Sequence, residues 1–190
     1  MCIRDRPKTQ SFDFLATLAP MIDFSNKLVP LIETPRAIDT VTQIAAFKDV
    51  VGLFFGAADS SASLGCKLAW EPLLYARQKV VLAAAMYNLF TIDAPFFYID
   101  DKEGLKNEAE AVKNLGFTGK AAIHPDQIDF INESFAPTSE EIAEGKKVLE
   151  EYQKSGGGAV KIDGQMVDEP IAEAMRLKIS LGEEESENKD

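Results

Sequence analysis

Histidine and cysteine are scarce in this chain, and their scarcity excludes several kinds of site. The 190 residues include one histidine, His124, and two cysteines, Cys2 and Cys66, which do not form a C-x-x-C pair. Zinc sites built from several histidines are therefore excluded, and a Ser-His-Asp or Cys-His arrangement would have to use His124. Neither a disulfide framework nor a thiolate metal site is indicated. The remaining chemistry depends on carboxylates, backbone amides and a hard cation.

Positive charge and long apolar runs are also in short supply. Lys and Arg number 20 against 31 Asp and Glu, which gives a formal net charge of -11. Nucleic acid and anionic membranes need clustered positive charge, so neither is expected as a partner. No apolar stretch reaches the roughly 18 residues of a membrane span, and the amino terminus lacks the apolar core of a signal peptide. We therefore expect a cytoplasmic protein, or a mitochondrial-matrix protein if the source is eukaryotic.

Short apolar runs alternate with helical patterns along the first two thirds of the chain. The expected strands are residues 27–33, 50–56, 89–95 and 119–125, and the expected helices are residues 35–47, 73–87 and 102–115. Nearly continuous apolar runs are typical of parallel strands that are buried on both faces. The alternation predicts a parallel α/β fold.

The last third of the chain has a different pattern. Thr138 followed by Glu141 fits a capping box, which predicts a helix that ends at the glycine-rich break 155–158. A hairpin around Asp163-Gly164 and a final helix after Pro170 are expected next. We interpret residues 136–181 as a helical lid and residues 182–190 as a disordered acidic tail.

Acidic and polar residues follow the expected strands. Glu33 ends the first, Asp59 lies just beyond the second, Asp93 ends the third and His124 ends the fourth. Ligand sites of parallel α/β folds form at the carboxyl ends of the strands. Glu33 and Asp59 on adjacent strands could converge on Mg²⁺, which accepts two protein oxygens together with water and substrate. From the pattern alone, capping of the following helices explains the two acids equally well.

Other candidate residues also have two interpretations. The small residues from Gly52 to Ala58 allow close approach of a substrate, or simply make a tight turn. The backbone of residues 123–125 could line a ligand cleft, whereas as structure alone His124 would bond a neighbouring backbone group. Asp168 precedes a helix with Pro170 near its start, and its pattern alone favours an N-cap.

Six motifs resemble those of one known family and occur in the family's order: Leu31-Ile-Glu-Thr34, Phe55-Gly-Ala-Ala-Asp59, Thr91-Ile-Asp93, Gly116-Phe-Thr-Gly-Lys-Ala-Ala-Ile-His-Pro-Asp-Gln127, Phe135-Ala-Pro137 and Asp163-Gly-Gln-Met-Val-Asp168. The family is the citrate lyase beta subunit-like group of the HpcH/HpaI aldolase superfamily, which includes malyl-CoA, methylmalyl-CoA and citramalyl-CoA lyases. The resemblance runs from about Pro7 to the last helix.

The resemblance implies a fold and a site. The fold is a (βα)₈ TIM barrel with a C-terminal lid that reaches a neighbouring subunit, in a homo-oligomer such as a trimer or hexamer. Glu33 and Asp59 are implied as Mg²⁺ ligands, and Asp168 as the catalytic lid carboxylate supplied to the adjacent protomer. The binding site of the acyl-CoA and the 2-oxo acid is implied to be lined by Ala58, Asp59, Ile123, His124 and Pro125.

The chain is shorter than the roughly 250 residues of a complete barrel. Pro7-Lys8-Thr9 resembles the end of the family's fourth strand, so residues 7–135 are expected to supply the last four βα units. Residues 1–6 do not resemble the family and are interpreted as a foreign leader. We therefore expect a truncated protein that lacks the first half of the barrel.

The implied activity is reversible, Mg²⁺-dependent cleavage of a 3-hydroxyacyl-CoA, of the citramalyl-CoA or malyl-CoA type, to acetyl-CoA and a 2-oxo acid. Two alternatives stay open. The first is a thioesterase that acts on malyl-CoA-like thioesters with the same metal site. The second is a non-catalytic or inert fragment.

Overall fold

The computed structural model describes residues 2–18, 26–156 and 158–187. The chain divides into two compact units, Met1–Phe135 and Ala136–Asp190, which are described separately. The division falls where the sequence predicts the C-terminal segment to begin. Within the described ranges, no helix is both long and apolar enough to cross a membrane.

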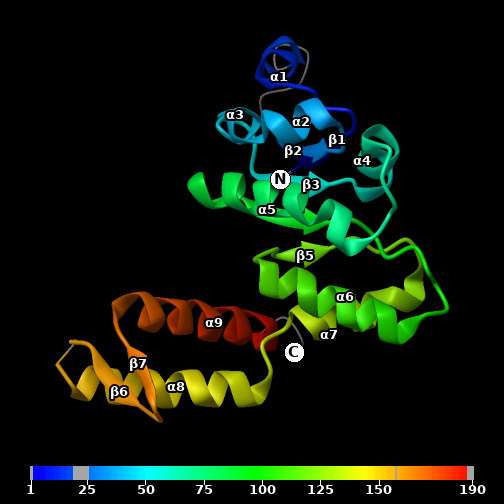
Figure 1. Cartoon of the computed structure of the whole chain (residues 1–190). Coiled ribbons are helices and arrows are strands. Elements are labelled where there is room, and N and C mark those ends of the chain that lie inside the picture. The colour runs from blue at the N-terminus through cyan, green and yellow to red at the C-terminus, as the bar shows by residue number, and fades with distance from the viewer. Residues whose placement is uncertain (1, 19–25, 157, 188–190) are drawn as a thin grey trace. The chain divides into compact units, whose positions relative to one another are not determined.

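The first unit contains a parallel sheet whose strands follow one another in chain order (Figure 1). In the described part of this unit the strands are β1 (Cys2–Arg6), β2 (Asn26–Ile32), β3 (Gly52–Phe55), β4 (Phe90–Asp93) and β5 (Gly119–Lys120). The predicted parallel α/β fold is confirmed. The fourth expected strand, residues 119–125, is observed only as the two residues of β5.

Strand β1 lies within residues 1–6, which are interpreted above as a foreign leader. It pairs in parallel with β2, from Cys2 opposite Asn26 to Arg6 opposite Pro30. Backbone hydrogen bonds hold such a pair, and a charged sequence is common in an edge strand. A search for apolar runs, which are typical of buried strands, therefore does not predict β1.

Helices follow the strands, and their ends are explained by local chemistry. They are α1 (Phe12–Leu18), α2 (Pro35–Asp39), α3 (Val41–Ala45), α4 (Ala57–Leu64), α5 (Trp70–Met86), α6 (Lys102–Leu115), the short 3₁₀ helix η2 (Pro125–Gln127) and α7 (Ile128–Phe135). Helix α6 has the predicted bounds and ends at Gly116, whose φ of 105° suits glycine. The single helix expected over residues 35–47 is instead broken at Thr40, whose hydroxyl bonds back to the carbonyl of Arg36.

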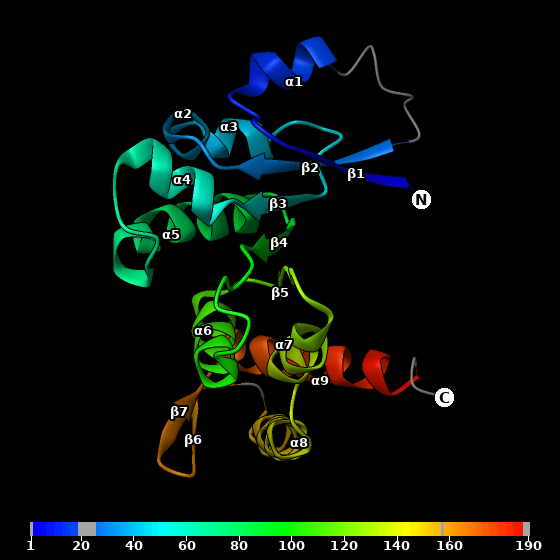
Figure 2. The same ribbon diagram turned by 90° about the vertical axis from the view of Figure 1, so that its right-hand side faces the viewer.

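The core of the first unit lies between the sheet and its helices. Ile32 and Phe55 on the sheet are fully buried, as are Ile44 of α3 and Val80 of α5. The alternating strand residues, such as Phe54, point to the opposite face and are only half-buried. The two faces of the sheet therefore differ, and the carboxyl ends of β2 and β3 lie at the same edge (Figure 2).

The second unit is a helical pair with a small hairpin: α8 (Ser139–Lys154), β6 (Val160–Ile162), β7 (Gln165–Val167) and α9 (Glu169–Glu187). The predicted capping box is present, since Thr138 and Glu141 exchange hydrogen bonds of 2.9 and 3.1 Å. Asp163 and Gly164 both have positive φ, as the hairpin turn requires. Tyr152, Ile162 and Val167 belong to a separate small core.

The acidic end of the chain differs from the prediction of a disordered tail beginning at residue 182. Helix α9 continues to Glu187, and residues 188–190 lie outside the described residues. Glutamate is a good helix former, so an acidic run that follows an established helix extends it readily.

Candidate active site

Glu33 and Asp59 approach one another at the carboxyl ends of β2 and β3. Leu31 and Ile32 pair with Phe54 and Phe55, so Glu33 comes opposite Gly56, and Asp59 lies in the first turn of α4. A Cβ atom on Gly56 would lie 2.6 Å from the Glu33 Cβ. The absence of a side chain at residue 56 therefore makes room for the Glu33 carboxylate.

The Glu33 carboxylate is held in place by backbone from the turn that follows β1. The main-chain N–H of Lys8 donates to Glu33 Oε1 at 2.7 Å, and the φ of Lys8 is +52°, which is unusual for a residue other than glycine. The sequence predicted no such role for Lys8. The only available signal was that residues 7–9 resemble the end of a strand.

The surroundings of Glu33 raise its pKa above the ordinary value. Burial is the largest cause, because Glu33 is only 3% exposed, and the adjacent Asp59 carboxyl raises the pKa further. The Lys8 N–H opposes both effects. A buried carboxyl beside a second carboxyl is poorly stabilised as an anion, and a hard divalent cation would relieve both the burial and the repulsion.

Few protein oxygens are available to a cation at the Glu33–Asp59 pair. The described residues contain no group of three or more His, Cys, Asp and Glu side chains that could hold a metal. Two carboxylates nevertheless suit Mg²⁺, which usually keeps several waters and rarely receives a complete cage of protein ligands. The remaining coordination positions would be open to water or to an oxygen-rich substrate.

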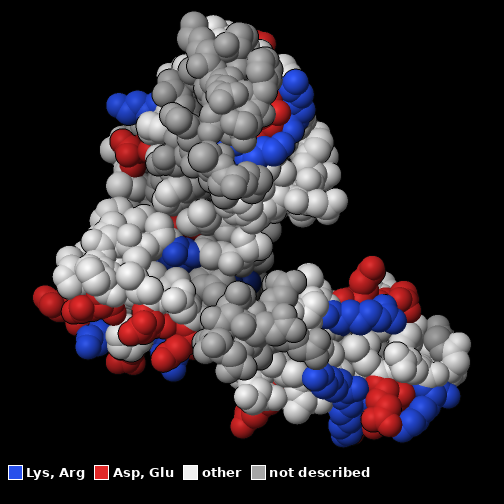
Figure 3. Space-filling view, turned by 180° about the vertical axis from the view of Figure 1, so that it is seen from behind, with Lys and Arg blue, Asp and Glu red and all other residues white. Residues whose placement is uncertain are grey.

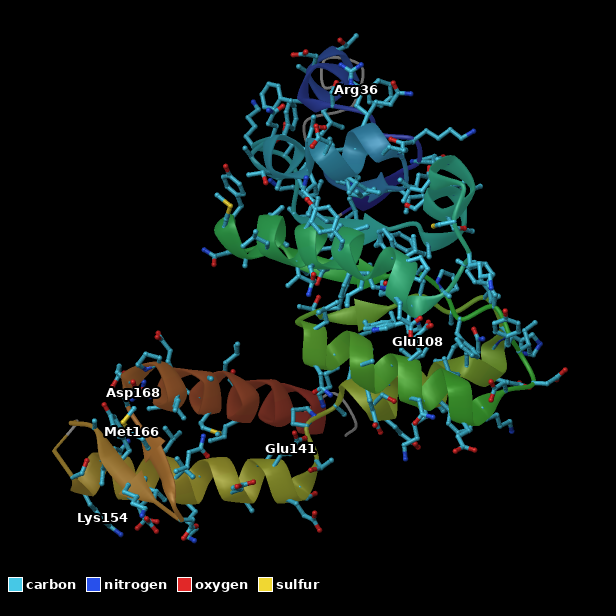
Figure 4. All side chains as sticks on the ribbon, in the orientation of Figure 1. Arg36, Glu108, Glu141, Lys154, Met166 and Asp168 are labelled. Atoms are coloured by element: carbon cyan, nitrogen blue, oxygen red, sulfur yellow. The ribbon has the colours of Figure 1, made fainter. Side chains whose placement is uncertain are left out.

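Asp93 also ends a strand, but it faces the helix-covered side of the sheet. Its carboxylate accepts from Arg77 Nε at 2.8 Å and from Lys120 Nζ at 2.9 Å. Lys120 also donates to the carbonyl of Ala94 and to Glu108 of α6, which is labelled in Figure 4. Asp93 is thus neutralised in a buried charge network and is separate from the Glu33–Asp59 pair.

Residues 121–124 leave the sheet directly after β5. The Ile123 side chain is 47% exposed, and His124 Nδ1 accepts from the Asp126 N–H at 3.3 Å. The bonding of His124 to neighbouring backbone agrees with its structural interpretation. Gln127 ends the family-like motif of residues 116–127, but the sequence assigned it no role in the site. Its side chain accepts from the Ile123 N–H at 3.0 Å and donates to the Phe96 carbonyl at 2.9 Å.

Asp168 belongs to the second unit, at the start of α9 and near Met166 of β7 (Figure 4). Its Oδ1 accepts from the Ile171 N–H at 3.4 Å, which is a long N-cap contact. The next residue, Glu169, bonds the Tyr152 hydroxyl at 3.1 Å and Arg176 at 2.7 Å. Asp168 therefore contributes to helix capping but is held less tightly than its neighbour.

Charged side chains of both signs are mixed on the second unit. On the face seen in Figure 3, its basic side chains lie among acidic ones rather than in a separate patch. Lys147 bonds Asp163 and Lys154 bonds Glu150, each at 2.7 Å. These four surface charges are therefore paired locally on the second unit.

Comparison with known proteins identifies the family. The chain belongs to the HpcH/HpaI aldolase/citrate lyase family, whose model matches residues 22–125. The resemblance found in the sequence is thereby confirmed. The matched segment includes Glu33, Asp59 and the backbone that follows β5.

Individual relatives are similar over most of this chain. The citrate lyase subunit beta of Haemophilus influenzae is 34% identical over 159 residues, which are 80% of this chain and 55% of the relative. The mitochondrial citramalyl-CoA lyase of Rattus norvegicus is 32% identical over 170 residues, which are 81% of this chain and 50% of the relative. The chain thus spans about half the length of the curated relatives it matches.

A solved structure is similar as well. The CitE protein of Mycobacterium tuberculosis, in complex with magnesium, acetoacetate and coenzyme A, matches with a TM-score of 0.84 at 30% identity. The match covers 95% of this chain and 68% of that chain. The similarity extends over almost all of the chain.

Proposed function

We propose that this protein is a Mg²⁺-dependent lyase that cleaves a carbon–carbon bond of a 3-hydroxyacyl-CoA to give acetyl-CoA and a 2-oxo acid. The observation that carries the proposal is the buried Glu33 carboxyl beside Asp59, with the Lys8 N–H on its Oε1. Relatives named as lyases of this kind, and one crystallised with magnesium and coenzyme A, support it.

Glu33 and Asp59 would hold the cation at the carboxyl ends of β2 and β3. The chemistry that Mg²⁺ supplies when bound is Lewis-acid polarisation of the 2-oxo acid carbonyl. The Lys8 N–H orients the Glu33 carboxylate, and the glycine at residue 56 keeps the adjacent space open. Ala58 with Asp59, and Ile123, His124 and Pro125, would line the acyl-CoA and the oxo acid.

Asp168 is proposed to move a proton to or from the acetyl methyl group. Cleavage releases acetyl-CoA through a thioester enolate, which needs a proton donor nearby and exclusion of bulk water. The second unit would act as a lid that brings Asp168 to the site of an adjacent protomer. The active form would then be a homo-oligomer, a trimer or a hexamer, and the sheet of the first unit would form the later part of a TIM barrel.

Product analysis with the 190-residue chain tests the proposal. Citramalyl-CoA and malyl-CoA are incubated with the protein and Mg²⁺, and the CoA species and acids are separated by liquid chromatography. We expect acetyl-CoA and a 2-oxo acid in equal amounts, with loss of both in EDTA and in the Asp59→Ala variant. A free hydroxy acid with unacylated CoA would show hydrolysis instead. An absence of turnover and of Mg²⁺ binding would contradict the proposal and favour a non-catalytic chain.

A further inference from the structure

Gln127 connects two loops at the carboxyl edge of the sheet through both atoms of its side-chain amide. Its side chain is 1% exposed. Its Oε1 accepts from the Ile123 N–H at 3.0 Å, and its Nε2 donates to the Phe96 carbonyl at 2.9 Å. The loop after β4 and the loop after β5 are therefore joined by one buried side chain.

This connection begins where the sheet ends. Strand β5 has two residues, and the last main-chain bond between the neighbouring segments runs from the Ala121 N–H to the Asp93 carbonyl at 2.9 Å. Two residues later, the N–H of Ile123 is bonded to a side chain. Gln127 thus continues the connection between the two segments beyond the point at which β4 and β5 pair.

The two ends of the connection differ in how firmly they are anchored. Phe96 is buried in a small cluster with Leu105 of α6 and Ile131 of α7. Ile123, in contrast, presents a side chain that is 47% exposed. The bond through Gln127 therefore ties the backbone of Ile123, a residue with an exposed side chain, to the loop that holds Phe96.

We propose that Gln127 is a positioning residue, which fixes the backbone of Ile123–Pro125 against the acyl-CoA. The inference rests on the proposed function, because that function makes residues 123–125 part of the ligand site. A glutamine fits this position because the connection needs one acceptor and one donor at the end of a single side chain. A carboxylate of the same shape could accept from Ile123 but could not donate to Phe96.

The variants follow from this geometry. Gln127→Glu removes the donor to Phe96 and keeps the side-chain shape, whereas Gln127→Asn keeps the amide but is too short to reach both partners. Gln78→Glu, at an exposed glutamine of α5, is the matched control for the added charge. Ile131→Val removes one methylene from the cluster behind Phe96 and controls for a loss of packing without a loss of hydrogen bonds.

The experiment combines coenzyme A titration by calorimetry, Mg²⁺ titration, thermal unfolding and hydrogen exchange by mass spectrometry on the 190-residue chain. In both Gln127 variants we expect faster exchange over residues 121–127 and about tenfold weaker binding of coenzyme A, the usual size of the loss of one buried hydrogen bond. The affinity for Mg²⁺ should not change. Both control variants should bind coenzyme A as the wild type does. If the Gln127→Glu variant fails to fold, the Gln127→Asn variant alone tests the role of Gln127 in binding coenzyme A.

Two results would overturn the inference, and they differ from a failure of the proposed function. The first is wild-type affinity for coenzyme A in a folded Gln127 variant. The second is a loss of affinity no greater than that of Ile131→Val, because Gln127 would then act only through general stability. A wild-type chain that binds no coenzyme A would instead contradict the proposed function, and the inference would fall with it.

Discussion

At the scale of single residues, two features of the candidate site lower the stability of the ligand-free protein. The Glu33 carboxyl is buried next to a second carboxyl, and Lys8 adopts a positive φ to donate its N–H to it. Strained backbone and unfavourably placed charges concentrate at functional sites, where a ligand compensates for them. Both features lead to predictions that can be measured without an assay of activity.

We expect Glu33→Gln to raise the melting temperature of the metal-free protein at pH 7. The pKa of Glu33 is higher in the folded state than in the unfolded state. The folded protein therefore loses stability as the pH rises from the unfolded pKa through the folded pKa, and below the unfolded pKa this loss is absent. The amide removes this loss at neutral pH and still accepts from the Lys8 N–H. Thermal unfolding at pH 7 and pH 4 measures the difference, which should disappear at the lower pH. Added Mg²⁺ should stabilise the wild type but not the variant.

The exposed Glu110 of α6 provides the control, and Glu110→Gln should leave both the pH dependence and the Mg²⁺ response as they are in the wild type. A Glu33→Gln variant that is less stable than the wild type at pH 7 without metal would contradict this account of Glu33.

Substitutions of Lys8 separate its backbone from its side chain. Lys8→Gly keeps the N–H and suits a φ of +52°, so stability should change by about 1 kcal/mol or less. Lys8→Pro removes the donor to Glu33 and cannot adopt a positive φ, and should destabilise by at least about 2 kcal/mol. Urea unfolding and Mg²⁺ titration are the measurements. Equal Mg²⁺ affinity in the two variants would show that the N–H does not orient Glu33.

At the scale of secondary-structure elements, a buried charge network holds strands β4 and β5 to helices α5 and α6. Asp93 at the end of β4 bonds Arg77 of α5 and Lys120 of β5, and Lys120 bonds Glu108 of α6. The Arg77 guanidinium also lies over the Trp70 ring at 4.8 Å. Three elements therefore meet at the fully buried Asp93 carboxylate, and Lys120 extends the network to α6.

We expect Asp93→Ala to destabilise the chain by about 3–5 kcal/mol, because it leaves the buried Arg77 guanidinium without its carboxylate partner and takes one of two carboxylates from Lys120. Asp39→Ala is the control, since Asp39 pairs with Lys79 at 3.6 Å on the surface and exposed pairs contribute about 1 kcal/mol or less. Urea unfolding followed by circular dichroism measures both. A loss below about 1 kcal/mol for Asp93→Ala would mean that the network contributes little to the cohesion of these elements.

At the scale of the whole molecule, the proposed chemistry is divided between the two units. Glu33 and Asp59 belong to the first unit and Asp168 to the second. The N-cap contact of Asp168 is 3.4 Å long, so its loss alone should cost little stability. Our proposal that Asp168 serves an adjacent protomer makes activity a property of the assembly rather than of one chain.

Mixing two inactive variants tests this division. Asp168→Asn should abolish turnover and leave Mg²⁺ binding intact, with a stability change of about 1 kcal/mol or less. Asp59→Ala should abolish both turnover and Mg²⁺ binding. A mixture of the two should recover part of the activity, because one protomer supplies a sound lid and the other a sound metal site. Mass spectrometry of tagged mixtures verifies subunit exchange; complete exchange without recovery would place Asp168 in its own chain's site or outside catalysis.

Much of the fold could be predicted because it depends on local patterns. Helix α6, the capping box at Thr138 and the turn at Asp163 and Gly164 arise from residues within a few positions of each other. Strand β1 could not be predicted in this way, because its sequence is charged and its partner is β2, more than 20 residues later. The break at Thr40 was missed because the apolar spacing of α2 and α3 continues across it.

The sequence by itself determined the parallel α/β class and the acids at the ends of the strands, since apolar runs and helix caps are local signals. Only the tertiary structure decided which acids belong together. Glu33 and Asp93 both follow apolar strands, but the alternation of side chains along a strand sends them to opposite faces of the sheet. The Lys8 N–H reaches Glu33 across 25 residues, and the Gln127 amide reaches Phe96 across 31. Contacts of that separation exist only once the strands are aligned, so no local pattern encodes them.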